Sequence, residues 1–315
     1  MVQRLWVLAA LAGCAGDDTD GDNVTADVVI DHFEPDVLTE AITTEACTLS
    51  GGTATTCYRI SVTGQPTTHD VGPFCPRSIT DDASVAGIWI EDGAVWDVDG
   101  AFIVGLAEFY SDDAWQLYDA STGLVNVTDT QASCEAAARP DVDPAYNNYC
   151  VECSLDYLDD TTSTYLIPVT PVPLDQVDEI GNAGVVGVAF NGIDYDPPAP
   201  VQAILAAHTI AAFDDCGGHV NTNAGYHYHG STGCPPEIAQ EDGHGPMIGY
   251  AIDGYGLFAM LDEDGTEPDD LDECRGHSDG TRGYHYHVAS PGENAFIGCF
   301  HGEQGSREGD SGPPR

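Results

Sequence analysis

A duplicated histidine motif constrains the fold of this chain more than any other feature. Residues 216–229 have the pattern Cys-x-Gly-His-x5-Gly-Tyr-His-Tyr-His, and residues 274–287 repeat it without a gap, 58 positions later. Each copy follows a related segment that ends in a strong turn signal, Asn-Gly at 191–192 and Asp-Gly at 253–254. Such internal self-similarity predicts two equivalent half-domains related by an approximate twofold axis.

The run Tyr-His-Tyr-His sorts its side chains by type if it forms a β-strand. Because side chains alternate along a strand, His227 and His229 then share one face, and Tyr226 and Tyr228 share the other. Two histidines spaced in this way lie about 7 Å apart at Cα, close enough to bind one metal ion. The corresponding residues of the second copy are His285 and His287 on one face and Tyr284 and Tyr286 on the other.

Each motif supplies one more histidine, His219 or His277, from a nearby Gly-containing segment. Three imidazoles around a metal ion leave an open position for water or substrate. Two alternatives stay open: all six histidines line one cleft that binds a pair of metals, or they form hydrogen-bonded ladders without metal. The four motif tyrosines and Asp253 are candidates for residues that support the ligands. For Asp253, a structural role in its turn is the simpler interpretation.

The ten cysteines that follow Cys14 predict disulfide bonds, since an even number in an exported chain is typical of a disulfide framework. Cys47 and Cys57 bracket a hairpin-like turn and form one candidate pair. Each repeat also contains a cysteine with a downstream partner, which gives two further candidates, Cys216 with Cys234 and Cys274 with Cys299. Cys150 and Cys153 are interpreted as ordinary disulfide partners, because no second such pair exists to complete a zinc site.

Short apolar runs separated by Gly, Pro and Asp predict a mainly β, antiparallel fold with few short helices, with α+β as the alternative. Strands are expected at 57–63, 88–90, 94–98, 102–106, 115–118, 187–190 and 249–252, helices at 134–139 and 201–213, and a Pro-rich connection from 165 to 173. Residues 27–180 are expected to form a β-rich part, either separate from the repeats at 181–301 or in one domain with them. Residues 302–315 are expected to be a disordered tail.

The N-terminus resembles the signal peptide of a bacterial lipoprotein. Residues 1–13 combine Arg4 with an apolar run that is too short to span a bilayer, and Leu-Ala-Gly precedes Cys14. Cleavage before Cys14 would leave a lipidated cysteine followed by a flexible tether, 14–26. These features predict an exported protein anchored at the outer membrane or cell surface.

The charge of the chain excludes one class of function. The sequence contains 53 Asp and Glu against eight Lys and Arg, all eight of them arginine, for a formal net charge of −45. Binding to nucleic acid by neutralising its phosphates requires basic patches, so no nucleic-acid partner is expected. The acidic surface is compatible with cations, and bound calcium is one option, although the Asp-rich segment 17–22 lacks the glutamate that ends an EF-hand loop.

The same motifs resemble a known family, the YHYH-domain proteins, which are secreted or lipid-anchored bacterial proteins. The resemblance is carried by residues 187–196, 216–219, 225–229, 248–254, 271–277, 283–287 and 297–300, and more weakly by 68–74 and 167–169. Where the family often has Pro-Asn after a phenylalanine, this chain has Cys75-Pro76, and the stretch around 100–160 looks like its own insertion.

The resemblance implies metal binding at the histidine motifs and adds two candidate ligands, His69 and His244. Three functions compete at this point. The first is a non-catalytic lipoprotein that holds Cu or Zn. The second is a metalloenzyme that activates water or performs copper redox chemistry. The third is a surface or adhesive module rigidified by calcium. No protein partner can be named from the sequence.

Overall fold

A computed structural model describes residues 25–180 and 184–309 of the protein. Within these residues most regular structure is β-strand, and the α-helices are short, so the predicted mainly β class is confirmed. None of the helices in the described part is long and apolar enough to cross a membrane. The predicted signal peptide and Cys14 lie outside the described residues.

An eight-stranded sheet carries both histidine motifs. Its strand order is β11-β12-β9-β8-β13-β14-β16-β15, and the central pair β8 and β13 is antiparallel. From this centre the next pairing is antiparallel, the next parallel and the last antiparallel on both sides. The predicted duplication about an approximate twofold axis is therefore confirmed. The strands are Gly187–Ala189 (β8), Asp194–Tyr195 (β9), Gly218–Asn221 (β11), Gly225–Tyr228 (β12), Met247–Ala251 (β13), Gly256–Phe258 (β14), Gly276–Asp279 (β15) and Gly283–His287 (β16).

Smaller sheets join distant parts of the chain to this centre. The four-stranded sheet β1-β2-β6-β18 combines Thr43–Thr48 (β1), Ala54–Val62 (β2), Ser163–Pro168 (β6) and Ser306–Arg307 (β18). The two-stranded pairs are Cys299–Gly302 (β17) with Pro173–Glu179 (β7), Ile210–Ala211 (β10) with Cys150–Val151 (β5), and Ile88–Glu91 (β3) with Ala94–Asp97 (β4). One continuous hydrophobic core runs beneath these sheets.

The chain end up to residue 309 is ordered, in contrast to the disordered tail expected from 302 onward. Arg307 pairs with Tyr165 of β6 in the sheet register, and its guanidinium also contacts Asp194. Glu303 and Gln304 are buried. Glu303 accepts hydrogen bonds from the backbone and hydroxyl of Thr53. These partners lie far away in sequence, so the local composition of residues 302–309 could not show that this segment is ordered. Residues 310–315 lie outside the described part.

Three predicted elements differ from the structure. Residues 115–118, expected as a strand, lie in a loop that makes one isolated bridge, between Tyr118 and Val125. Residues 102–106, expected as a strand, belong to the helix Gly100–Phe109 (α1), because Asp99 caps its first turn by accepting from the backbone N–H of Phe102. The helix expected at 201–213 ends early, as Val201–Ala206 (α3), and the chain then enters β10. The remaining helix, Gln131–Ala137 (α2), overlaps the range predicted for it, 134–139.

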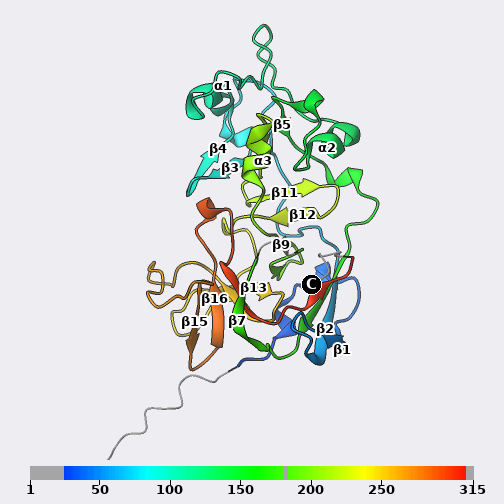
Figure 1. Ribbon diagram of the computed structural model, residues 1–315, viewed down its shortest axis with the longest axis vertical. Helices are drawn as coiled ribbons and strands as arrows, with labels where there is room; N and C mark the ends of the chain where they lie inside the picture. The colour runs from blue at the N-terminus through cyan, green and yellow to red at the C-terminus, as the bar shows by residue number, and fades with distance from the viewer. Residues whose placement is uncertain (1–24, 181–183, 310–315) are drawn as a thin grey trace, which may run out of the picture.

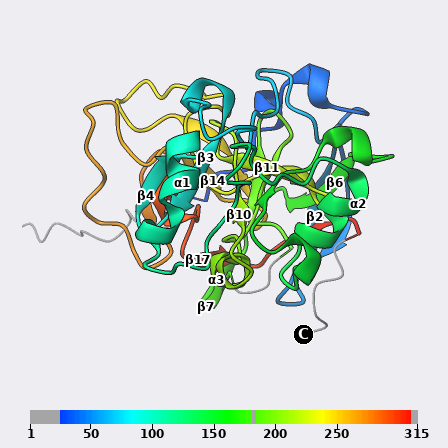
Figure 2. The ribbon, with the colours of Figure 1, turned by 90° about the horizontal axis from the view of Figure 1, so that it is seen from above.

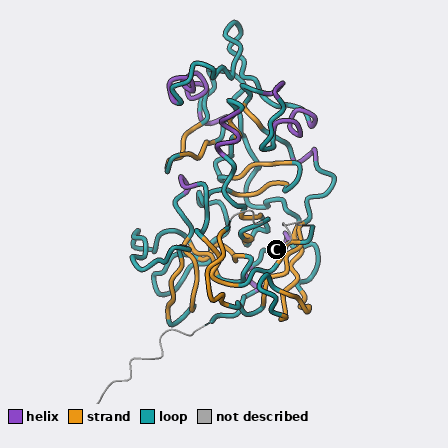
Figure 3. Tube along the Cα trace, viewed as in Figure 1, coloured by secondary structure: helices purple, strands orange, loops and turns teal. Residues whose placement is uncertain are grey.

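The helices gather at one end of the molecule. In Figure 1 the helices α1, α2 and α3 occupy the upper part, while β13, β15 and β16 lie in the lower part, with β11 and β12 between them. Figure 2 shows α1 and α2 on opposite sides of α3 and β10. Figure 3 shows the same division, with the α-helical segments at the top and most of the strands below. The hairpin β11–β12 therefore faces the helical part, unlike β15–β16.

Five disulfides link the ten cysteines of the described part. The three predicted pairs are present: Cys47–Cys57, Cys216–Cys234 and Cys274–Cys299. The other four cysteines form Cys75–Cys150 and Cys134–Cys153, so Cys150 and Cys153 are ordinary disulfide partners as expected.

Candidate metal centres

Each motif folds into an antiparallel hairpin that brings three histidines to one face. In the first hairpin His219 of β11 lies directly opposite His227 of β12, and His229 follows two residues later on the same side. In the second, His277 of β15 is directly opposite His285 of β16. The short spacer between the two parts of the motif is therefore the hairpin turn. A strand pair joined in this way positions three imidazoles without any contribution from distant parts of the chain.

The glycines of the motif are explained by this geometry. Gly225 and Gly283, which begin β12 and β16, have φ angles of +78° and +65°, a conformation that side chains disfavour. Gly218 leaves room for a tyrosine, since a methyl group there would lie 2.6 Å from Tyr226 Oη. The glycine before each motif histidine is thus a packing requirement for the tyrosine of the facing strand.

Each hairpin is stabilised by one aspartate that the sequence interpretation did not single out. Asp214 Oδ1 accepts from the backbone N–H groups of Cys216 and Gly218, and both of its carboxylate oxygens accept from Tyr226 Oη. Asp272 makes the equivalent bonds in the second copy. The signal was present, because an aspartate stands two residues before the motif cysteine in both copies.

The first cluster comprises His219, His227 and His229. Their candidate ligand atoms all lie within 4.8 Å of one another, and their ring centroids are 4.7–5.0 Å apart. His227 Nδ1 donates to the carbonyl of Gly225 at 3.0 Å, which leaves Nε2 as the atom that can accept or bind a cation. That Nε2 atom lies 3.7 Å from Asp196 Oδ2.

The second cluster comprises His244, His277, His285 and His287, and its candidate ligand atoms also lie within 4.8 Å of one another. His244 comes from the segment before β13 and completes the set supplied by the hairpin. Every imidazole is fixed through Nδ1: backbone carbonyls of Gly245, Gly283 and Ala259 accept from His244, His285 and His287 at 2.8–2.9 Å, and Asp270 accepts from His277 at 2.7 Å. This is the arrangement by which outer groups orient metal-binding histidines.

The Nε2 atoms of the second cluster converge on one point. His244 Nε2 lies 2.9 Å from His285 Nε2 and 3.1 Å from His287 Nε2, and His277 Nε2 is buried without a hydrogen-bond partner. A carbonyl oxygen only accepts, so Nδ1 carries the proton in the three carbonyl-bonded rings, and their Nε2 lone pairs face one another. A cation bound between them would remove this repulsion. Tetrahedral Zn with Zn–N distances near 2.0–2.1 Å separates its ligand atoms by about 3.3 Å, close to the spacing here.

Burial keeps these imidazoles neutral, which is the form that binds metal. Burial lowers the pKa of His227 to about 4, that of His285 to about 3 and that of His287 to about 4. Burial also lowers the pKa of His219 and of His229 well below the usual value, and the neighbouring histidines contribute in the same direction.

The motif tyrosines lie away from the clusters, on the opposite strand face. Their hydroxyls bond to polar side chains: Tyr286 donates to the buried Asp253 at 2.6 Å, and Tyr228 accepts from the amide of the buried Asn191 at 3.0 Å. The tyrosines thus lie opposite the histidines, as the strand alternation predicts, and Asp253 bonds to Tyr286 on the tyrosine face. Asp253 is a buried turn residue whose pKa is raised to about 6 by burial, against the opposing effect of the Tyr286 hydrogen bond.

The two ligand candidates added by the family resemblance have different outcomes. His244 belongs to the second cluster. His69 lies on the tyrosine face instead, with Nε2 3.2 Å from Tyr226 Oη, and the structure brings it to neither cluster. His69 stands in an upstream segment that sequence alone could not place relative to the hairpin.

These features define a disulfide-linked, mainly β protein with a duplicated hairpin and two separate histidine clusters. Residues 164–270 match the family model described as YHYH protein, so the family resemblance is confirmed over this range. The matched range contains the first motif and His244, and it ends before the second motif at 274–287. Comparison with the curated proteins and with the solved structures found no significant match.

Proposed function

We propose that this protein binds two transition-metal ions, copper or zinc, one at each histidine cluster. The observation that carries the proposal is the convergence of three Nε2 atoms: His244 Nε2 lies 2.9 Å from that of His285 and 3.1 Å from that of His287. Each of these rings is also fixed by a hydrogen bond from Nδ1 to a backbone carbonyl. In a hydrogen-bonded histidine network an N–H donor of one ring faces an acceptor of the next. Here three unprotonated Nε2 atoms, all acceptors, face a common point. The first cluster repeats the hairpin that supplies most of this arrangement.

The donor set favours zinc or copper over calcium. Imidazole nitrogen suits Zn and Cu, whereas Ca²⁺ takes six to eight oxygen ligands. The histidine groups found among the described residues contain no carboxylate. The acidic segment 17–22, considered from the sequence as a calcium loop, lies outside the described residues.

Elemental analysis of the mature protein tests this proposal. After refolding with Cu and Zn and removal of loose metal, we expect two equivalents per chain. His227→Ala and the double variant His285→Ala/His287→Ala each leave two imidazoles in their cluster and should each lose one equivalent. His69→Ala is the matched control, because its imidazole lies on the opposite face, and it should retain both. Only trace metal in the wild type, or unchanged stoichiometry in both cluster variants, contradicts the proposal.

We further propose that the protein is exported and anchored to a membrane through lipidated Cys14. Support comes from the signal-like N-terminus and from the five disulfides, which are typical of oxidising compartments. Mass spectrometry of the N-terminal peptide from the native host tests the anchor. A diacylated or triacylated Cys14 is expected, and an unmodified Cys14 would contradict it.

A further inference from the structure

The two histidine clusters are built on equivalent hairpins but differ at one decisive position. In the sheet register Tyr228 pairs with Tyr195, and Tyr286 pairs with Leu257, so the residues that follow, Asp196 and Phe258, occupy equivalent places. Phe258 packs its ring 4.7 Å from that of His244 and 5.0 Å from that of His285. Asp196 instead presents a carboxylate 3.7 Å from His227 Nε2.

The second cluster has enough nitrogens to saturate a tetrahedral ion. Four imidazoles occupy four positions, and this full protein coordination is typical of sites that hold a metal without chemistry at it. Phe258 covers the imidazoles on one side, and Arg282 lies over the ring of Phe258 at 5.8 Å. This cluster therefore offers no obvious position for an external ligand.

The first cluster has one imidazole fewer. The aligned segments Gly-Asn-Ala-Gly-Val-Val-Gly at 181–187 and Gly-His-Gly-Pro-Met-Ile-Gly at 243–249 place Asn182 at the sequence position of His244. Three histidine ligands leave one position of a tetrahedral ion open, as in catalytic zinc sites. Within the described residues, His219, His227 and His229 are the only members of that cluster.

A cavity of about 330 Å³ opens onto the first cluster. All three of its histidines and Asp196 line the cavity, and the remaining wall is mostly apolar, with Phe74, Ile204 and several alanines and prolines. The volume lies within the range of pockets that bind small molecules, about 300–1,000 Å³. Apolar walls around a few polar groups at one end are likewise typical of such pockets.

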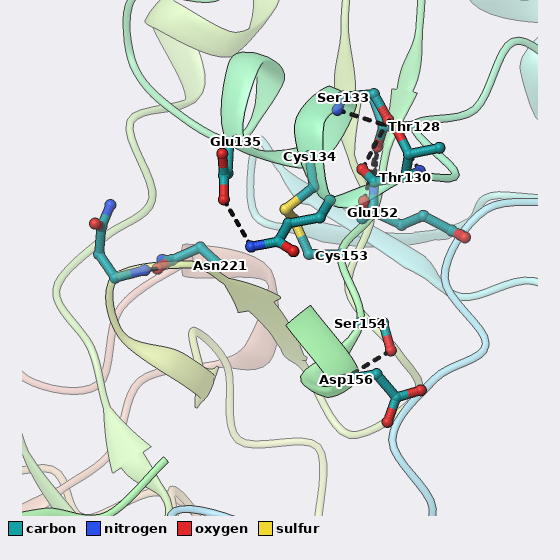
Figure 4. Close-up of a disulfide and its surroundings, with 12 residues drawn as sticks. Thr128, Thr130, Ser133, Cys134, Glu135, Glu152, Cys153, Ser154, Asp156 and Asn221 are labelled. Carbon is teal, nitrogen blue, oxygen red and sulfur yellow. Dashed lines mark hydrogen bonds between the residues drawn. A yellow bond between two sulfur atoms is a disulfide. The ribbon is translucent and has the colours of Figure 1, made fainter. Parts of the chain in front are cut away.

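The wall opposite the sheet comes from the segment that the sequence interpretation treated as an insertion. Ala137, Ala138, Glu152 and Cys153 line the cavity together with Asn221 of β11. Figure 4 shows the Cys134–Cys153 disulfide joining α2 to the segment after β5, with Asn221 nearby. The insertion and its disulfide thus complete an enclosure over the first cluster.

We propose that the first cluster is a ligand-binding metal site for a small organic molecule with an oxygen-donor head and an apolar body. The proposal rests on metal binding at this cluster. The head oxygen takes the open position on the metal, and an adjacent N–H or O–H group donates to Asp196. The apolar body fills the cavity beneath the insertion. The second cluster holds its metal without an external ligand.

Cobalt-substituted protein provides the test, because the visible spectrum of Co²⁺ responds to a change in its ligands. Benzohydroxamate is the probe, since it combines an oxygen donor, an N–H and an aromatic ring. Acetohydroxamate is the control that lacks the ring. We expect saturable binding at one of two cobalt ions, with the aromatic probe at least tenfold tighter because its ring leaves water for an apolar wall.

Matched variants assign the response to one cluster. His219→Ala leaves two imidazoles in the first cluster and should lose one cobalt and the spectral response together. The double variant His285→Ala/His287→Ala leaves two imidazoles in the second cluster and should lose the other cobalt but keep the response. Ala138→Phe, at a half-buried position in the wall, should retain both ions but reduce the preference for the aromatic probe. Retained two-ion stoichiometry serves as its folding control.

The outcomes separate this inference from the proposed function. Absence of bound cobalt overturns metal binding itself and the ligand site with it. If the wild type binds two cobalt ions, a response that persists in His219→Ala or vanishes in His285→Ala/His287→Ala overturns only the ligand site. Equal affinity for the two hydroxamates, or no spectral response with either, also overturns the ligand site.

Discussion

The contacts of single motif residues explain why both copies have the same residue at those positions, and Gly218 is the clearest example. A methyl group there would lie 2.6 Å from Tyr226 Oη and Cζ, and Tyr226 is buried with its hydroxyl bonded to Asp214. Gly218→Ala should therefore reduce the free energy of unfolding by about 1–3 kcal/mol, the usual cost of overpacking. Urea denaturation measures this. The control Gly280→Ala adds a methyl group into open space and should change stability by less than about 0.5 kcal/mol. Equal effects would show that the motif glycine is not a packing requirement.

The tyrosine face makes a second residue-scale prediction. Tyr286 Oη donates to the buried Asp253 carboxylate and accepts from the backbone N–H of His301, whereas Tyr228 Oη meets the neutral amide of Asn191. Tyr286→Phe should cost about 2–3 kcal/mol, because a carboxylate loses a donor, and Tyr228→Phe about 1 kcal/mol. Chemical denaturation of the two variants compares them. A larger cost for Tyr228→Phe would contradict the assigned roles.

Among the secondary-structure elements, the sequence predicted those best in which the alternation of side chains and the internal repeat indicated the same strand. The alternation of Tyr and His, the turn signals and the repeat predicted the hairpin strands and their twofold relation, because these depend on local geometry. The strand expected at 102–106 was wrong, since five apolar residues fit a strand or a helix, and the deciding interaction is the cap from Asp99. The separation of the histidines into two clusters could not be predicted either. It depends on the antiparallel pairing of β8 with β13, which puts the two hairpins at opposite edges of one sheet.

Long-range packing also decided which candidate ligands reach a cluster. His244 reaches His285 and His287 because β13, which follows it, pairs beside β14, the neighbour of β16. His69 was also a candidate ligand, but it contacts Tyr226 on the tyrosine face of the hairpin. Asp196 was missed as a site residue because its meaning emerges only from comparison with Phe258 in the sheet register.

At the scale of the whole molecule, the buried histidines give folding a pH dependence. In the metal-free protein the pKa of His227 is lowered to about 4 and that of His285 to about 3, so between pH 6.5 and 4 the unfolded chain binds more protons at these residues than the folded one. Their contribution to the free energy of unfolding is therefore present above pH 6.5 and lost as the pH falls through this range. Each histidine contributes a slope of at most about 1.4 kcal/mol per pH unit. The double variant His227→Ala/His285→Ala should show a shallower decline in urea denaturation series; an unchanged slope would contradict the burial of neutral imidazoles.

The disulfides make a prediction about how the insertion supports the site. Replacing Cys134 and Cys153 by Ala, or Cys47 and Cys57 by Ala, removes a cross-link over a short loop and should cost about 2–4 kcal/mol in either case. Only the first pair holds the wall of the cavity, through Cys153. We expect benzohydroxamate to bind more weakly to the cobalt form of the first variant and normally to the second. Equal affinities in both would show that the insertion does not shape the site.

Anomalous diffraction at the Zn or Cu absorption edge, from crystals of the metal-loaded protein, locates the bound ions directly. Two strong peaks per chain are expected. One lies among His219, His227 and His229, and the other lies about 2.0–2.1 Å from the Nε2 atoms of the four histidines of the second cluster. Loaded crystals with no peak at either cluster, or with peaks only at surface carboxylates, would contradict it.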